Sequence, residues 1–118
     1  MKPLRIYVAG AYSADSEGKI LQNVQKAIDV GLILFKLGHF PYIPHITYMV
    51  DKRANELNIK MTWENYMDYH IKWLEVSDAL FLVSHSKGAD IELEFAKKHG
   101  KQIFYSLNEI PNLIVEVK

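Results

Sequence analysis

Hydrophobic and polar residues follow one another along the chain in blocks that predict alternating strands and helices. Short apolar runs at 4–10 and 79–83 are typical of strands buried on both faces. A third strand is expected at 101–105 and a short final one at 113–117. The segment 40–45 contains two prolines, which suit an edge strand and exclude a helix.

Between the strands, apolar residues recur at helical spacing. The first helix is expected to end at Gly38, and the residues that mark its apolar positions are Ile20, Leu21, Val24, Ala27, Ile28, Leu34 and Phe35. Thr62 is a plausible N-cap for a second helix, whose apolar stripe includes His70. Gly100 ends a third helix. The weak pattern over 46–60 predicts a mobile helical or irregular excursion that could serve as a lid.

The alternation of strands and helices predicts the α/β class and a single domain over residues 1–118. The expected architecture is a flavodoxin-like, doubly wound and mainly parallel five-stranded sheet with helices on both faces. Ligands of such sheets bind at the carboxyl ends of the strands. Here those ends are the turn at Gly10 and the turn over 84–88, which lead into helices.

Composition narrows the class of protein and partner. The chain has 14 basic and 14 acidic side chains, and this balance gives no support for binding a nucleic acid polymer or an anionic membrane surface. The absence of cysteine excludes disulfides, thiolate metal sites and a cysteine nucleophile. No apolar run resembles a signal peptide or a membrane span, so we expect a soluble cytoplasmic protein with no membrane partner.

Several common catalytic motifs are missing. The turn at Gly10 fits neither G-x-G-x-x-G nor the P-loop pattern, and no G-x-S-x-G is present, so no nucleotide cofactor is expected. The histidines lack H-E-x-x-H or paired-ligand spacing, so no metal site is expected. Their positions are His39, His45, His70, His85 and His99.

Glu92 is the strongest candidate for chemistry. It shares a helical face with Ala89, Leu93 and Ala96, so a carboxylate stands on the face expected to pack inward. A buried carboxylate is costly unless it is paired or used. The alternative is a glutamate that favours the first turns of a helix and pairs with a nearby basic group. Glu94 points elsewhere and is expected to be solvated.

The same two turns and their neighbours supply the remaining candidates for a small polar pocket. These are Tyr7, Gly10, Ser13, His45, His70, Ser86 and Gly88. Four of them have a plain structural alternative: Tyr7 and His70 could be core residues, His45 a surface residue and Ser86 an N-cap. Small and hydroxyl residues before a helix N-terminus also make the 84–88 turn a candidate phosphate cradle.

Four segments taken together resemble a known enzyme family. Residues 6–13, 41–45, 73–79 and 86–92 look like the corresponding motifs of nucleoside 2-deoxyribosyltransferases, of deoxynucleoside 5'-monophosphate N-glycosidases, and of small phage-type members of that superfamily. The resemblance runs from about Arg5 to Ile103. It implies a flavodoxin-like fold, a homodimer or higher oligomer with sites near subunit contacts, and a covalent 2-deoxyribosyl intermediate.

The resemblance also implies residue roles. Glu92 lies six residues after Ser86 and matches the family's nucleophile, while Ser86 and Gly88 match the turn that binds the 5' end of the nucleotide. Tyr7 matches a tyrosine beside the nucleophile. Two positions depart from the family pattern: His70 replaces an aspartate, and Ser13 replaces an arginine of the phosphate hydrolases. A histidine can still give a proton to a departing base.

The expected function is cleavage of the N-glycosidic bond of a (deoxy)nucleoside or its 5'-monophosphate, by hydrolysis or by transfer to a second base. Glu92, His70 and Tyr7 would be catalytic, and Gly10, Ser13, His45, Ser86 and Gly88 would bind the substrate. One alternative is a non-catalytic nucleotide-binding or regulatory module. Another is a hydrolase of a different N-ribosyl compound, including a nicotinamide dinucleotide.

Overall fold

A four-stranded parallel sheet lies at the centre of the computed structural model, which describes residues 2–114. Its strands are β1 (Arg5–Ala9), β2 (Phe40–Tyr42), β3 (Ala79–Leu82) and β4 (Gln102–Phe104). They are arranged in the order β2-β1-β3-β4, and every neighbouring pair is parallel. The predicted α/β class and parallel sheet are confirmed, and the order is compatible with a flavodoxin-like fold.

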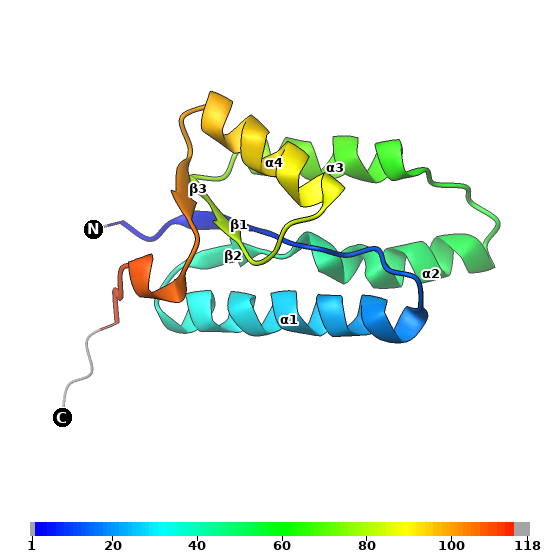
Figure 1. Ribbon diagram of the computed structural model, residues 1–118, viewed down its shortest axis with the longest axis horizontal. Helices are drawn as coiled ribbons and strands as arrows, with labels where there is room; N and C mark the ends of the chain where they lie inside the picture. The colour runs from blue at the N-terminus through cyan, green and yellow to red at the C-terminus, as the bar shows by residue number, and fades with distance from the viewer. Residues whose placement is uncertain (1, 115–118) are drawn as a thin grey trace.

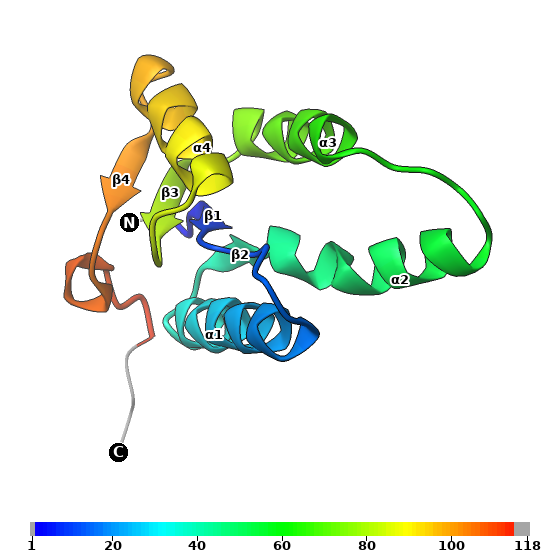
Figure 2. The ribbon, with the colours of Figure 1, turned by 45° about the vertical axis from the view of Figure 1, so that its right-hand side comes forward.

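Helices cover both faces of the sheet. Helix α1 (Glu17–Lys36) packs on one face, while α3 (Trp63–Glu75) and α4 (Lys87–Lys98) pack on the other (Figures 1 and 2). Helix α2 (Tyr48–Glu56) extends beyond the sheet, opposite α3. Two short 3₁₀ turns, η1 (Pro44–Thr47) and η2 (Leu107–Glu109), follow β2 and β4.

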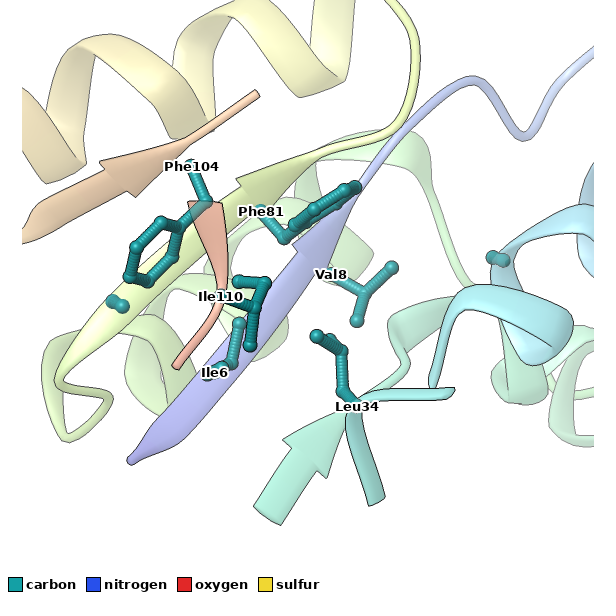
Figure 3. Packing of buried hydrophobic residues seen from close by; sticks show 8 residues of the cluster. Ile6, Val8, Leu34, Phe81, Phe104 and Ile110 are labelled. Carbon is teal, nitrogen blue, oxygen red and sulfur yellow. The ribbon is translucent and has the colours of Figure 1, made fainter. Parts of the chain in front are cut away.

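The α1 side of the sheet holds a continuous apolar cluster. Figure 3 shows Ile6, Val8, Phe81 and Phe104 of the strands meeting Leu34 of α1, with Ile110 closing the cluster after η2. Burial of such side chains contributes about 1.5–3 kcal/mol each and is the main favourable term for the fold. The alternate residues of β1 point to the opposite face, where Tyr7 and Ala9 pack among residues of α3 and α4.

The helix boundaries follow the local signals in the sequence. The Thr62 hydroxyl accepts from the Asn65 N–H in a capping box, and the Ser86 hydroxyl accepts from the Ala89 N–H. Gly38, after α1, has a φ of 98°, in the left-handed region where glycine is favoured. The predicted helix ends and the Thr62 cap are therefore confirmed.

The segment after β1 and α1 differs from its prediction. The strand predicted over 40–45 ends at Tyr42, and His45 lies in the turn η1. Pro44 is the reason, because it has no N–H to continue the sheet and its fixed φ suits the start of a helical turn. Much of the excursion predicted over 46–60 is the regular helix α2.

The buried face of α1 is narrower than its apolar pattern suggested. The helix buries Val24, Ala27, Gly31 and Leu34, whereas the Phe35 side chain is 64% exposed. The positions three and four residues apart face the sheet, and a residue one step further turns away. Leu21 is likewise exposed, so assigning both residues to the inward face was wrong.

The fifth strand predicted over 113–117 lies mostly outside the described residues. Leu113 and Ile114, its described part, belong to no strand, and the Leu113 N–H donates to the carbonyl of Leu37. Within residues 2–114, no helix combines the length and apolar character needed to cross a lipid bilayer.

Candidate functional site

A cavity of about 460 Å³ opens at the carboxyl ends of β1 and β3. Its size is within the usual range for a small-molecule site, and its place is where open α/β sheets bind ligands. It is lined by residues of the first turn, of η1 and α2, and of α3 and α4. They are Gly10, Tyr12, Ser13, Pro44, His45, Thr47, Asp51, Met61, Trp63, Tyr66, Met67, His70, Ser86, Lys87, Gly88, Ala89 and Glu92.

Glu92 lies in the second turn of α4 and is 5% exposed, as its helical face predicted. Its carboxylate accepts a hydrogen bond from the hydroxyl of Tyr7. Burial raises the pKa of Glu92 to about 7, and the Tyr7 bond opposes part of that rise. No basic residue forms an ion pair with Glu92 in the described chain, so the alternative of a simple structural pair receives no support.

Tyr7 lies behind the cavity wall and donates its hydroxyl hydrogen bond to Glu92. It is the central residue of β1, is fully buried and does not line the cavity itself. Its ring lies 5.5 Å from that of Tyr42, centroid to centroid. Burial, followed by the nearby Glu92 carboxylate, raises the pKa of Tyr7 well above its usual value, so its hydroxyl remains a hydrogen-bond donor.

His70 reaches the cavity from the inward face of α3. It is 8% exposed and lies among the rings of Tyr42, Tyr66 and Tyr69. The Tyr42 hydroxyl oxygen is 3.4 Å from His70 Nδ1. Burial, with a smaller effect of His45, lowers the pKa of His70 to about 4. The imidazole is therefore neutral near neutral pH, so one ring nitrogen can donate a hydrogen bond and the other can accept one.

His45 is also buried but holds the backbone of the first turn. Its Nε2 lies 3.1 Å from the carbonyl oxygen of Gly10 and 3.2 Å from that of Ala11. Carbonyl oxygens only accept, so Nε2 carries the proton. Nδ1 is buried with no hydrogen-bond partner in the described residues. Buried His39 contrasts with it, because both of its ring nitrogens are bonded, to Leu4 and to Pro111.

The first turn approaches the turn after β3 closely. A Cβ atom at Gly10 would lie 3.1 Å from Cβ of Val83, tighter than side chains normally pack. The Ala11 N–H donates to the Ser84 hydroxyl across the same gap, at 3.0 Å. This close approach explains the glycine and brings the two predicted turns into one site. Ser13, a little further along, lines the cavity and is exposed.

The α4 N-terminus forms the electropositive wall. The first N–H groups of a helix have no intrahelical partner and carry the positive end of the dipole. Ser86 caps the helix, and Lys87 and Gly88 follow at the cavity surface. The Lys87 ammonium lies 4.8 Å from the ring centroid of Trp63 at the start of α3. An anionic group entering the cavity therefore finds a favourable wall here.

The family model for a domain of unknown function, DUF4406, matches residues 4–105. The chain belongs to the DUF4406 family. The matched range contains all four strands and every residue that lines the cavity. No match to a curated protein is found.

The DUF4406 chain thus brings together all the predicted site residues, seven of them on the cavity wall and Tyr7 beneath it. The sequence pattern missed one side chain that stands out in the structure, Asp51 of α2. It lies in the stretch 46–60, whose hydrophobic pattern is weak. The only sequence feature that could have marked it is its negative charge. Lys87 also lines the cavity and lies within the segment 86–92, but its sequence position did not mark it as a site residue.

The DUF4406 cavity contains carboxylate and imidazole groups, yet their spacing does not form a metal site. Among residues 2–114, no cluster of three or more such side chains could hold a metal ion.

Proposed function

We propose that this protein cleaves the N-glycosidic bond of a (deoxy)nucleoside or its 5'-monophosphate, with Glu92 as the nucleophile. The observation that supports it best is a buried carboxylate at the wall of a nucleoside-sized cavity, bonded to the Tyr7 hydroxyl and without a cationic partner in the described chain. Holding such a group inward costs free energy, which is typical of functional carboxylates.

The first step forms a covalent intermediate. Ionised Glu92 attacks C1' of the sugar, and the bond between C1' and the base nitrogen breaks. The base leaves with the electron pair of that bond, which gives a glycosyl ester on Glu92. Water or a second base then attacks C1' and gives up a proton to solvent, while the ester bond between C1' and Glu92 breaks and restores the carboxylate. The Tyr7 hydroxyl orients the attacking carboxylate throughout.

The departing base needs stabilisation of its negative charge. Because the pKa of His70 is lowered to about 4, an imidazolium is scarce near neutral pH, which argues against His70 as the proton donor. We propose instead that neutral His70 donates a hydrogen bond from Nε2 to the base, which takes its proton from solvent. This keeps His70 in the reaction with a different role from the one expected from sequence.

Intact-protein mass spectrometry tests the proposal directly. The protein is incubated with deoxynucleosides and their 5'-monophosphates, and free base is followed by chromatography. We expect an adduct of deoxyribosyl mass that maps to Glu92, together with released base. The Glu94→Gln variant, two residues away and exposed, is the matched control and should form the same adduct.

Other outcomes separate the alternatives. Reaction with ribosyl but not deoxyribosyl compounds would indicate an N-ribosyl hydrolase. Nucleotide binding with neither adduct nor free base would overturn the enzymatic proposal in favour of a binding or regulatory module.

Tyr7→Phe tests the support of the nucleophile. The Tyr7 hydrogen bond lowers the pKa of Glu92, so its loss should raise that pKa further above the ordinary value. We expect activity near neutral pH to fall by about tenfold and the pH at half-maximal activity to move upward, with the fold retained. A pH profile of kcat/KM measures both. An equal loss at every pH would show that Tyr7 does not act through the ionisation of Glu92.

A further inference from the structure

Asp51 and Tyr66 form a polar pair on the cavity wall, away from β1 and β3. Asp51 belongs to the first turn of α2 and Tyr66 to α3, two helices that face one another and are joined by a long connection (Figure 2). The Tyr66 hydroxyl donates to Asp51 Oδ1 at 2.8 Å. Both residues line the same cavity as Glu92.

The pair presents hydrogen-bond acceptors to the cavity. Burial, with the Asp51 bond, raises the pKa of Tyr66 to about 12, so its proton stays directed at Oδ1. In the described residues, Asp51 has no ion pair, and no donor other than Tyr66 bonds to its side chain. The second oxygen, Oδ2, is thus available for N–H groups of a ligand, and the pair repels carbonyl oxygens.

The surroundings of the pair suit a flat heterocycle. Met61, Trp63 and Met67 add apolar and aromatic surface to the same cavity. Tyr12 adds a further ring to this cavity, and its pKa is raised to about 12, first by burial and then by the charge of Asp51. A planar base with N–H groups at its edge matches a wall that combines such surface with one carboxylate.

We propose that Asp51, oriented by Tyr66, selects substrates whose base bears an exocyclic amino group. Adenine, guanine and cytosine offer an exocyclic amino group to Oδ2, whereas the single N3–H of thymine and uracil lies between two carbonyl oxygens that the carboxylate repels. The inference rests on the proposed function, because it takes the base to occupy the cavity whose wall holds Glu92. It assigns a base-selecting residue to α2.

The charges on the cavity wall support binding of the base at Asp51 and of the phosphate at the opposite end of the substrate. Lys87 and the α4 N-terminus make one wall positive, and Asp51 makes the α2 wall negative. A nucleotide has its anionic phosphate and its amino-bearing base at opposite ends. Each end of such a substrate has a group of complementary charge on the cavity wall.

Calorimetric binding to the Glu92→Gln protein tests the proposal without depending on turnover. The probes are the 5'-monophosphates of deoxyadenosine, deoxyguanosine, deoxycytidine and thymidine. They share the sugar and the phosphate, so differences in their affinity report on the base. We expect the best amino-bearing nucleotide to bind at least about tenfold more tightly than thymidylate. Adding Asp51→Asn should remove that preference, because an amide can donate to carbonyl oxygens.

Two further variants make the result specific. Asp68→Asn removes a carboxylate from an exposed position of α3 outside the cavity, and it should leave the preference unchanged. Tyr66→Phe frees Asp51 without removing its charge and should weaken the preference in part. An unchanged ranking of nucleotides in Asp51→Asn overturns the assignment, and N-glycosidic cleavage by the wild type would still stand. Failure of all four nucleotides, and of the corresponding deoxynucleosides, to bind overturns both proposals.

Discussion

Replacing the Glu92 carboxylate by an amide is expected to abolish turnover and to stabilise the fold at alkaline pH. In Glu92→Gln the nucleophile is lost, and covalent catalysis by one carboxylate supplies a factor of at least about a thousand in rate. Tyr7 can still donate its hydrogen bond, to the amide oxygen. The cavity therefore keeps its shape while the reaction stops.

The stability change follows from the raised pKa of Glu92, which is about 7 in the folded protein against an ordinary 4.5. Between these values the folded protein holds a proton that the unfolded chain has lost, so stability falls as pH rises through this window. The difference corresponds to about 3 kcal/mol at about pH 8 and vanishes below the unfolded pKa. Urea denaturation of wild type and Glu92→Gln at about pH 8 and about pH 4.5 measures it.

Glu94→Gln is the control for this prediction, because the side chain is exposed on the same helix. It should leave turnover and stability close to those of the wild type. If Glu92→Gln kept its turnover, or were less stable than the wild type at alkaline pH, the carboxylate would not be the strained nucleophile that we propose.

The second large effect is a rise in activity with pH. Only ionised Glu92 can attack C1', and its pKa is about 7, so the active fraction grows almost tenfold per unit below that value. We expect kcat/KM to increase by roughly a hundredfold between about pH 5 and about pH 8 and then to level off. Neutral His70 adds no falling limb in this range, because its pKa of about 4 lies below it.

A pH profile with stable deoxynucleoside substrates provides the measurement. If a His70 imidazolium had to give the proton, the active species would need Glu92 ionised and His70 protonated together. The profile would then be a bell with a maximum between the two pKa values. A bell-shaped pH profile that is lost in His70→Asn would contradict the hydrogen-bonding role proposed for His70.

Much of the fold could be predicted because its signals are local. The apolar runs at 4–10 and 79–83 could only be buried strands, and caps such as Thr62 and glycines such as Gly38 end helices wherever they occur. The turn η1 was missed since Pro44 is compatible with either an edge strand or a helical start. Only the contacts of that segment decide between the two.

Some features of the site could likewise be predicted from local sequence, and others depend on tertiary contacts. Helical spacing alone placed Glu92 on an inward face, and the chain order placed the two turns at one edge of the sheet. By contrast, the hydrogen bond from Tyr7 to Glu92 joins residues 85 positions apart. The pKa of Glu92 is raised by burial, which only the packed structure creates. Spacing carries no information on desolvation.

By itself, the sequence determined the α/β class, the inward Glu92 and the meeting of the turns at Gly10 and 84–88. The tertiary structure alone decided that His70 is neutral, that His45 holds the first turn and that Asp51 reaches the cavity. The physical reason is that periodicity reports which way a side chain faces within its own element. Its partners, its burial and hence its protonation depend on elements far away in the chain.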